Sequence, residues 1–178
     1  MTEYRSLRED EIGRGLFNDF IRHQVVDLCL RRENGEWVVR HDPFTDDWSE
    51  NDYRTLINCL RNTVRTGGFV CGAFCGGVLK GFVSAEKRFF GGENKYHDLS
   101  SLHVSEDMRR TGIGRELFWY ATDWAKKDGA KKLYISSHSA IESQAFYRAM
   151  GCVDAAEYDM RHTEAEPYDR QLEYVLQA

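Results

Sequence analysis

The sequence predicts a mixed α/β domain in which helices flank a mostly antiparallel sheet. Strand patterns at 69–74 and 78–84 are joined by the turn Cys75-Gly76-Gly77, as in a β-hairpin. A helical pattern with apolar residues at spacings of three and four follows at 112–128, and shorter strand and helix patterns come after it. No repeat, low-complexity tract or linker divides the 178 residues, so we expect one domain over 1–178.

The first half of the chain is expected to begin with a short strand at 3–7 and a helix over 9–22, although Gly13 and Gly15 weaken the helix start. Residues 25–40 resemble a hairpin around Asn34-Gly35, a dipeptide that favours tight turns. A loop is expected at 42–48. A second helix is predicted to begin at Ser49 and to end at Gly67-Gly68.

The second half is expected to add a strand that follows a turn at 91–92 and ends at Val104. The remaining elements are predicted to be a helix at 112–128, a strand at 132–137, a helix at 141–150, and two closing strands at 153–160 and 170–176.

Composition and charge exclude several classes of function. The net charge of −5, with no block of Lys and Arg, argues against a nucleic-acid-binding surface. No apolar run has the length of a membrane span, and the first residues do not resemble a signal peptide. Five cysteines without a C-x-x-C pair are expected to be reduced thiols, and we expect no metal site. These features predict a cytoplasmic protein without a nucleic-acid or membrane partner.

The most informative stretch is Arg109-x-x-Gly112-x-Gly114, which lies between a strand pattern and a helical pattern. This arrangement directs unpaired backbone N–H groups and the positive end of a helix dipole at one point, which favours a phosphate. Glycine allows the backbone to approach the ligand closely. Arg110 and Arg115 add positive charge. An ordinary strand-to-helix turn with solvated arginines accounts for the same residues and stays open as an alternative.

A second informative stretch is Phe146-Tyr147-Arg148-Ala149-Met150-Gly151, with Ser143 on the same helical face as Tyr147. Taken by itself, this stretch predicts only a small core helix that ends at a glycine.

Together the two stretches resemble the GNAT N-acetyltransferases. L-x-V-x-x-x-x-R-x-x-G-x-G is similar to the pyrophosphate loop of that family, and F-Y-x-x-x-G to its later helix, with Cys152 in place of a final phenylalanine. The resemblance is clear over about 69–160. It implies the GNAT fold, and transfer of an acetyl group from acetyl-CoA to a primary amine, without a metal or a covalent enzyme intermediate. The acceptor is expected to be a small molecule.

The resemblance also implies roles for single residues. Tyr147 is expected to protonate the leaving thiolate, because a phenol pKa of roughly 10 lies above a thiol pKa of roughly 8.5; the alternative is a hydroxyl that only packs. Backbone groups of the strand before the loop are implied to bind the pantetheine, and those of the loop the pyrophosphate. The residues implied to contact the cofactor are Leu102, His103, Val104, Arg109, Arg110, Thr111, Gly112, Ile113, Gly114, Arg115, Ser143 and Tyr147.

The sequence offers two candidates for the base that deprotonates the amine. Some family members carry a glutamate nine residues before the position of Arg109, where this chain has Ser100. On a regular strand Asp98, Ser100 and Leu102 share one face, with His103 on the other, so Asp98 acting through a water near Ser100 is one candidate. His138 is another. A surface carboxylate and a loop histidine are the plain alternatives.

Acidic residues and aromatic residues are the features of the sequence that bear on the acceptor. Six acidic residues in the C-terminal part would attract a cationic amine or would simply form a solvated loop: Glu157, Asp159, Glu164, Glu166, Asp169 and Glu173. Trp37, Phe44 and Trp48 lie where relatives cap the acceptor site. A non-catalytic acyl-CoA-binding module is the main alternative function. The chain is expected to be a monomer or a homodimer.

Overall fold

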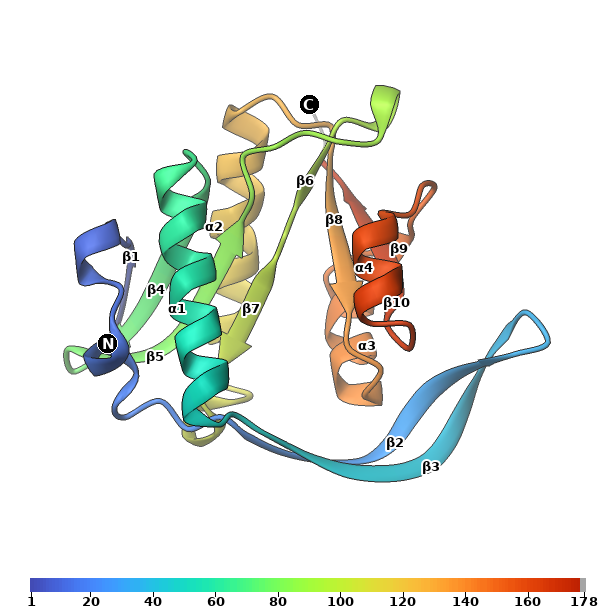
Figure 1. Ribbon diagram of the computed structural model, residues 1–178, viewed down its shortest axis with the longest axis horizontal. Helices are drawn as coiled ribbons and strands as arrows, with labels where there is room; N and C mark the ends of the chain where they lie inside the picture. Colours follow the sequence, from blue (N-terminus) through green and yellow to red (C-terminus); the bar gives the residue numbers. More distant parts are fainter. Residues whose placement is uncertain (177–178) are drawn as a thin grey trace.

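The computed structural model describes residues 1–176, and a sheet divided into two halves forms its centre (Figure 1). One half has the strand order β1-β4-β5-β7 and the other β6-β8-β10-β9, while β2 and β3 form a separate hairpin. The strands are β1 Thr2–Ser6, β2 His23–Glu33, β3 Glu36–Asp47, β4 Phe69–Cys75, β5 Val78–Ala85, β6 Tyr96–Asp98, β7 Ser101–Val104, β8 Lys132–Ser137, β9 Val153–Asp154 and β10 Arg170–Val175.

Helices cover both faces of the sheet. In Figure 1, α1 and α4 lie on the face toward the viewer, with α2 and α3 behind. The helices are α1 Glu50–Arg65, α2 Ile113–Lys127, α3 Ile141–Ala149 and α4 Met160–Ala165, with short 3-10 turns at η1 Glu9–Glu11, η2 Arg14–Phe17, η3 Gly92–Asn94 and η4 Glu106–Met108. Alternation along β4 produces the two cores: Val70 and Phe74 pack toward α1, and Cys71 and Ala73 toward α2. This arrangement confirms the predicted mixed α/β class.

Most predicted elements are present. The β2–β3 hairpin turns at Asn34 and Gly35, whose φ values of 50° and 87° fit a tight turn. Ser49 caps α1 and shares a capping box with Asp52. The strand at 132–137 and the helices at 112–128 and 141–150 correspond to β8, α2 and α3.

Three predictions about elements outside the strand that ends at Val104 were wrong. The helix predicted at 9–22 is replaced by the turns η1 and η2, because the backbone is extended at Gly13, with φ −148°, and interrupts any helix there. The loop predicted at 42–48 belongs to β3, which pairs with β2 as far as Asp47. The strand predicted at 153–160 ends at Asp154, and Asp159 then caps α4 by accepting the backbone N–H of Arg161.

The strand predicted to end at Val104 is broken, and this break positions the site. β6 pairs in parallel with β8, Asp98 lying opposite Tyr134, whereas β7 pairs antiparallel with β5 from Ser101 onward. Beyond the break β7 and β8 are no longer paired with each other, so the two halves of the sheet separate. A backbone gap at the centre of a sheet leaves main-chain polar groups free for a ligand.

No helix within residues 1–176 is long and apolar enough to cross a lipid bilayer.

Candidate active site

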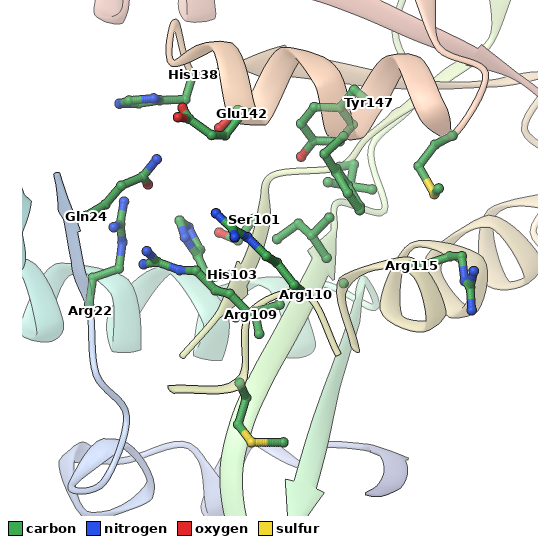
Figure 2. A pocket seen from close by; sticks show the side chains of 18 of the residues that line it. Arg22, Gln24, Ser101, His103, Arg109, Arg110, Arg115, His138, Glu142 and Tyr147 are labelled. Carbon is green, nitrogen blue, oxygen red and sulfur yellow. The ribbon is translucent and has the colours of Figure 1, made fainter. Parts of the chain in front are cut away.

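A cavity of about 610 Å³ opens where β7 and β8 separate (Figure 2). Its walls come from β7, the loop before α2, the end of β8, α3, and the start of β2 together with Arg22. This volume is within the range of about 300–1,000 Å³ found for small-molecule sites. Of the predicted site residues, those that line the cavity are Ser100, Leu102, His103, Val104, Arg109, Arg110, Gly112, Gly114, Arg115, His138, Ser143 and Tyr147.

The glycine loop has the geometry of an anion site. Arg110 and Gly112 both have left-handed backbones, with φ values of 63° and 92°. Gly112 is the N-cap of α2 and supplies no side-chain hydrogen bond, so the first N–H groups of the helix lack a side-chain cap. Arg115 is exposed at the start of α2. The guanidinium of Arg109 is used elsewhere, because it donates to the carbonyl oxygen of His23 at 2.6 Å. The loop therefore combines a free helix N-terminus with positive charge.

Two predicted cofactor contacts have side chains outside the cavity lining. The Thr111 hydroxyl donates to the carbonyl oxygen of Met108 at 2.6 Å. The Ile113 side chain is 2 % exposed and lies in the core below the loop. Only the backbone of these two residues faces the anion site that we infer.

Tyr147 points from α3 into the cavity, toward the strand that carries Ser101 and His103 (Figure 2). Its side chain is 9 % exposed and packs edge-on against Phe118. Within residues 1–176 its hydroxyl has no hydrogen-bond partner. Burial raises the pKa of Tyr147 well above its ordinary value, and the nearby Cys152 and Asp169 raise it further. The phenol is therefore protonated at neutral pH.

The break before β7 shifts the alternation of side chains, so the predicted grouping of Asp98, Ser100 and Leu102 on one face was wrong. Leu102 packs on the core under α2. Ser100 lies on the other face, and His103 contacts Trp48 and Phe82 on that same face. Burial, followed by the charges of nearby cations, lowers the pKa of His103 to about 3, so its ring is neutral.

Ser100 is exposed in the cavity and has a carboxylate behind it. Its hydroxyl donates to Glu86 at 2.8 Å and lies 2.8 Å from the hydroxyl of Ser84. Thr63 of α1 donates to the same oxygen of Glu86 at 2.7 Å. Sequence reasoning missed Glu86, which has no local signal because it meets Ser100 only through the pairing of β5 with β7.

The two candidates for the base, Asp98 and His138, lie in different surroundings. Asp98 does not line the cavity: it is 6 % exposed, and its Oδ2 lies 2.7 Å from Nε2 of His162 on α4. His138 does line the cavity, and its Nδ1 accepts the backbone N–H of Ala140 at 3.2 Å. Burial is the main reason why the pKa of His138 is lowered. A neutral ring that accepts at Nδ1 carries its hydrogen on Nε2, and therefore has no free lone pair for a proton.

The acidic C-terminal residues do not form one wall. Glu173 is buried against Lys132 at 2.8 Å, Asp159 caps α4, and Glu157 pairs with Asn94. Within the part of the chain that the structure describes, Asp169 is the one acidic residue of the six that forms a hydrogen bond with a residue lining the cavity: it accepts from Ser136 at 3.2 Å. Burial raises the pKa of Asp169 to about 6, and Glu166 adds to this effect.

The aromatic residues expected over the acceptor site have other contacts. Trp48 packs against Tyr53 and His103 in the core, and Trp37 lies under the guanidinium of Arg170. Phe44 packs on His138 at the edge of the cavity, with ring centroids 5.6 Å apart. In residues 1–176 no group of three or more His, Cys, Asp or Glu side chains is arranged to hold a metal ion.

A sequence model of the acetyltransferase (GNAT) family matches residues 34–152, which is more than half of the chain. The chain therefore belongs to the acetyltransferase (GNAT) family, and it is an acetyltransferase. This match confirms the family that the glycine loop and the Phe146-Tyr147 helix resemble. A search of curated proteins gives no match.

Solved structures share the fold along nearly the whole chain. A nourseothricin acetyltransferase superposes with a TM-score of 0.69 at 19% identity, covering 99% of each chain. A putative streptothricin acetyltransferase from Bacillus anthracis str. Ames, in complex with acetyl coenzyme A, gives 0.66 at 16% identity over 100% of this chain and 99% of that one. PaiA N-acetyltransferase from Thermoplasma acidophilum, in complex with coenzyme A, gives 0.62 at 18%, covering 98% and 99%. At these identities the likeness establishes the fold.

Proposed function

We propose that this protein transfers the acetyl group of acetyl-CoA to the primary amine of a small molecule by direct attack. The observation that carries the proposal is that one cavity contains both the N-terminus of α2, which has no side-chain cap, and the hydroxyl of Tyr147, which has no hydrogen-bond partner within residues 1–176. The first suits a diphosphate and the second a leaving thiolate. A ligand that spans both positions has the chemistry of an acyl-CoA.

The cofactor fits the residues present. Its pyrophosphate would lie against the backbone N–H groups of 110–115, with Arg110 and Arg115 adding charge. Its pantetheine amides would pair with the free edge of β7, between Ser101 and Val104, where the sheet is divided. Two of the structural neighbours were solved with coenzyme A or acetyl coenzyme A, which supports this arrangement.

The chemistry requires no covalent enzyme intermediate. The amine nitrogen forms a bond to the thioester carbonyl carbon, and the bond from that carbon to sulfur then breaks. Tyr147 gives its hydroxyl proton to the departing sulfur, and the proton that the nitrogen still carries in excess returns to the phenolate. The products are the amide and free coenzyme A, and Tyr147 is restored.

The acceptor end of the cavity has two serine walls. The last residues that pair β6 with β8 are Asp98 and Tyr134. Ser100 lies two residues after Asp98, and Ser136 two residues after Tyr134, so the two serines stand on opposite sides of the opening. Hydroxyls backed by carboxylates favour an ammonium group. The names of the first two neighbours, which refer to acetylation of nourseothricin and streptothricin, support a small amine as the acceptor.

The test compares stabilisation by ligands and turnover between the wild type and two variants of Gly114. At 100 times Kd a cofactor stabilises the native state by about 2.7 kcal/mol, which is roughly 5–10 °C in melting temperature for a chain of this size. Gly114→Asp places a carboxylate in the first turn of α2, which favours the helix but repels a phosphate. The uncharged control is Gly114→Asn, because a Cβ there meets only ordinary contacts at 3.4 Å or more.

We expect acetyl-CoA and coenzyme A, but not ATP, to stabilise the wild type, and Gly114→Asp to lose most of that shift while remaining folded. Thiol release from acetyl-CoA with L-lysine, spermidine and 2-phenylethylamine then tests transfer. Stabilisation without thiol release would favour the non-catalytic acyl-CoA-binding module. No stabilisation by either form of coenzyme A would refute the proposal.

A further inference from the structure

We infer that Asp169, acting through the hydroxyl of Ser136, receives the proton that the acceptor ammonium group loses before it attacks the thioester. This inference rests on the proposed function and adds a proton-accepting pair on the wall opposite Ser100. Ser136 lines the cavity and Asp169 lies directly behind it.

The hydrogen bonds around Ser136 determine that its hydroxyl donates to Asp169. The N–H of Asp159 donates to the hydroxyl oxygen of Tyr134 at 3.0 Å, and Tyr134 donates to Oε1 of Gln171. The amide nitrogen of Gln171 therefore donates to Ser136, at 3.0 Å, and Ser136 donates to Oδ2 of Asp169 at 3.2 Å. The Gln171 amide is held in this orientation because its nitrogen also donates to the carbonyl oxygen of Asp169 at 3.2 Å, and because the reverse orientation would leave the hydroxyl hydrogen of Tyr134 without its acceptor.

The consequence for Ser136 follows from the two lone pairs of a hydroxyl. One lone pair accepts from Gln171, and the hydrogen is committed to Asp169. The remaining lone pair can only accept. A group in the cavity that bonds to Ser136 must therefore be a donor, and an ammonium group is such a donor.

The charges around Asp169 suit a proton acceptor at neutral pH. From the α4 segment, Glu166 raises its pKa and His162 lowers it; from β8, the hydrogen bond of Ser136 lowers it. Burial is the largest effect and brings the pKa of Asp169 to about 6. From α3, Tyr147 experiences the charge of Asp169, so the carboxylate lies near the acid of the reaction. Such a carboxylate is mostly ionised at pH 7, but it is a stronger base than an ordinary aspartate with a pKa of about 3.9.

Three other candidates for the base, His138, Asp98 and Glu86, are less suited. The Nδ1 of His138 is occupied, and its protonated form is disfavoured by burial. Asp98 is buried against His162 outside the cavity lining. One oxygen of Glu86 already accepts from both Thr63 and Ser100, which suits it to hold a cationic group.

The proton step balances without another reactant. The ammonium group gives a proton to Oγ of Ser136 while the hydroxyl proton of Ser136 moves to Oδ2 of Asp169. The products are a neutral amine, an intact serine and a protonated aspartic acid. Asp169 returns its proton to solvent after each turnover.

The test is the pH profile of kcat/KM for whichever of L-lysine, spermidine and 2-phenylethylamine the wild type acetylates fastest. We expect the wild-type rate to rise through pH 6 to a plateau. In Asp169→Asn only the free amine reacts, so we expect a loss of about 100-fold at pH 7 that shrinks about tenfold for each pH unit above it. Ser136→Ala should reproduce this profile. A merely structural role would not give rescue by high pH.

Glu166→Gln is the matched control, because it removes a neighbouring negative charge without touching the pair. We expect it to stay active, with its acid limb moved to lower pH as the pKa of Asp169 falls. This variant also keeps the test decisive if Asp169→Asn does not fold. Stabilisation by coenzyme A must be equal in all variants.

Wild-type rates and an unchanged acid limb in Asp169→Asn, or an unmoved limb in Glu166→Gln, would overturn the inference and leave the proposed function standing. Failure of the wild type to release thiol with every amine would refute the proposed function itself, and the inference with it.

Discussion

Replacing Tyr147 by phenylalanine removes one hydroxyl from the cavity and changes little else. The side chain is 9 % exposed and held by ring contacts with Phe118 and Phe146. Because the hydroxyl has no hydrogen bond within residues 1–176, its removal leaves no buried partner unsatisfied. We therefore expect the melting temperature of Tyr147→Phe to stay within about 2 °C of the wild type.

The expected effect on catalysis is much larger. A positioned general acid contributes about 10²–10⁴ in rate, which corresponds to about 3–5 kcal/mol in the barrier. The assay is thiol release from acetyl-CoA at saturating amine, with stabilisation by coenzyme A measured in parallel. We expect kcat to fall by at least about 100-fold with no change in coenzyme A binding.

Tyr174→Phe provides a matched control for this prediction. Tyr174 packs on the same ring of Phe118, with centroids 5.3 Å apart, but it does not line the cavity. We expect it to keep wild-type turnover. If Tyr147→Phe retains a kcat within about threefold of the wild type, a factor far below that of a general acid, the hydroxyl is not the proton donor.

Three further predictions follow from the packing, the charges and the thiols. Gly81→Ala would place a Cβ 2.7 Å from a methyl carbon of Ile113, so we expect a loss of about 1–3 kcal/mol, seen as a lower melting temperature, whereas Gly13→Ala, with nothing within 4 Å, should be nearly neutral. Asp98 holds the pKa of His162 above its ordinary value, so the pair stabilises the fold fully below about pH 6.5, and this stabilisation is lost as the pH rises through the raised pKa. Hydrogen exchange of α4, corrected for intrinsic rates, should therefore be slower at about pH 5.5 than at about pH 8. A corrected exchange rate that does not change with pH would contradict this prediction. Cys59 is exposed, whereas the other four thiols are buried or partly buried, so limiting iodoacetamide should modify Cys59 first in peptide mass spectra.

The features that the sequence predicted correctly are those whose determinants are close together in the chain. The glycine loop depends on a strand, Gly112 and a helical pattern within a few residues, and Gly112 adopts the left-handed backbone that glycine favours. The start of α1 depends on Ser49 and Asp52 alone. Such local signals carry their own geometry.

The failures arise where distant pairing decides the outcome. The residues up to Val104 were predicted to form one strand, yet β8 pairs with Tyr96–Asp98 and β5 with Ser101–Val104. In the segment 9–22, Ile12, Phe17 and Phe20 have the spacing of one helical face and are buried, but two short turns bury them in place of a helix. Hydrophobic spacing predicts which residues are buried better than it predicts the backbone that buries them.

Asp169 shows why part of the site escapes sequence reasoning altogether. Its partner Ser136 lies 33 positions away in the chain, and the two meet because β10 pairs with β8 and brings Gln171 opposite Ser136. In the sequence Asp169 is one of six acidic residues in a polar stretch, with nothing to distinguish it. Its raised pKa is a property of burial and neighbours, which exist only in the fold.

The placement of Asp169 near Tyr147 also links the two proton transfers of the proposed reaction. While Asp169 is ionised, its negative charge helps to keep the pKa of Tyr147 high. Once Asp169 has taken the proton of the ammonium group, this contribution disappears, and the pKa of Tyr147 falls toward that of a thiol. Tyr147 therefore becomes a stronger acid after the amine has been activated, which is when the thiolate must be protonated. Burial remains the largest cause of the high pKa of Tyr147, and the charge of Asp169 adds a coupling that favours removal of the amine proton before protonation of the thiolate.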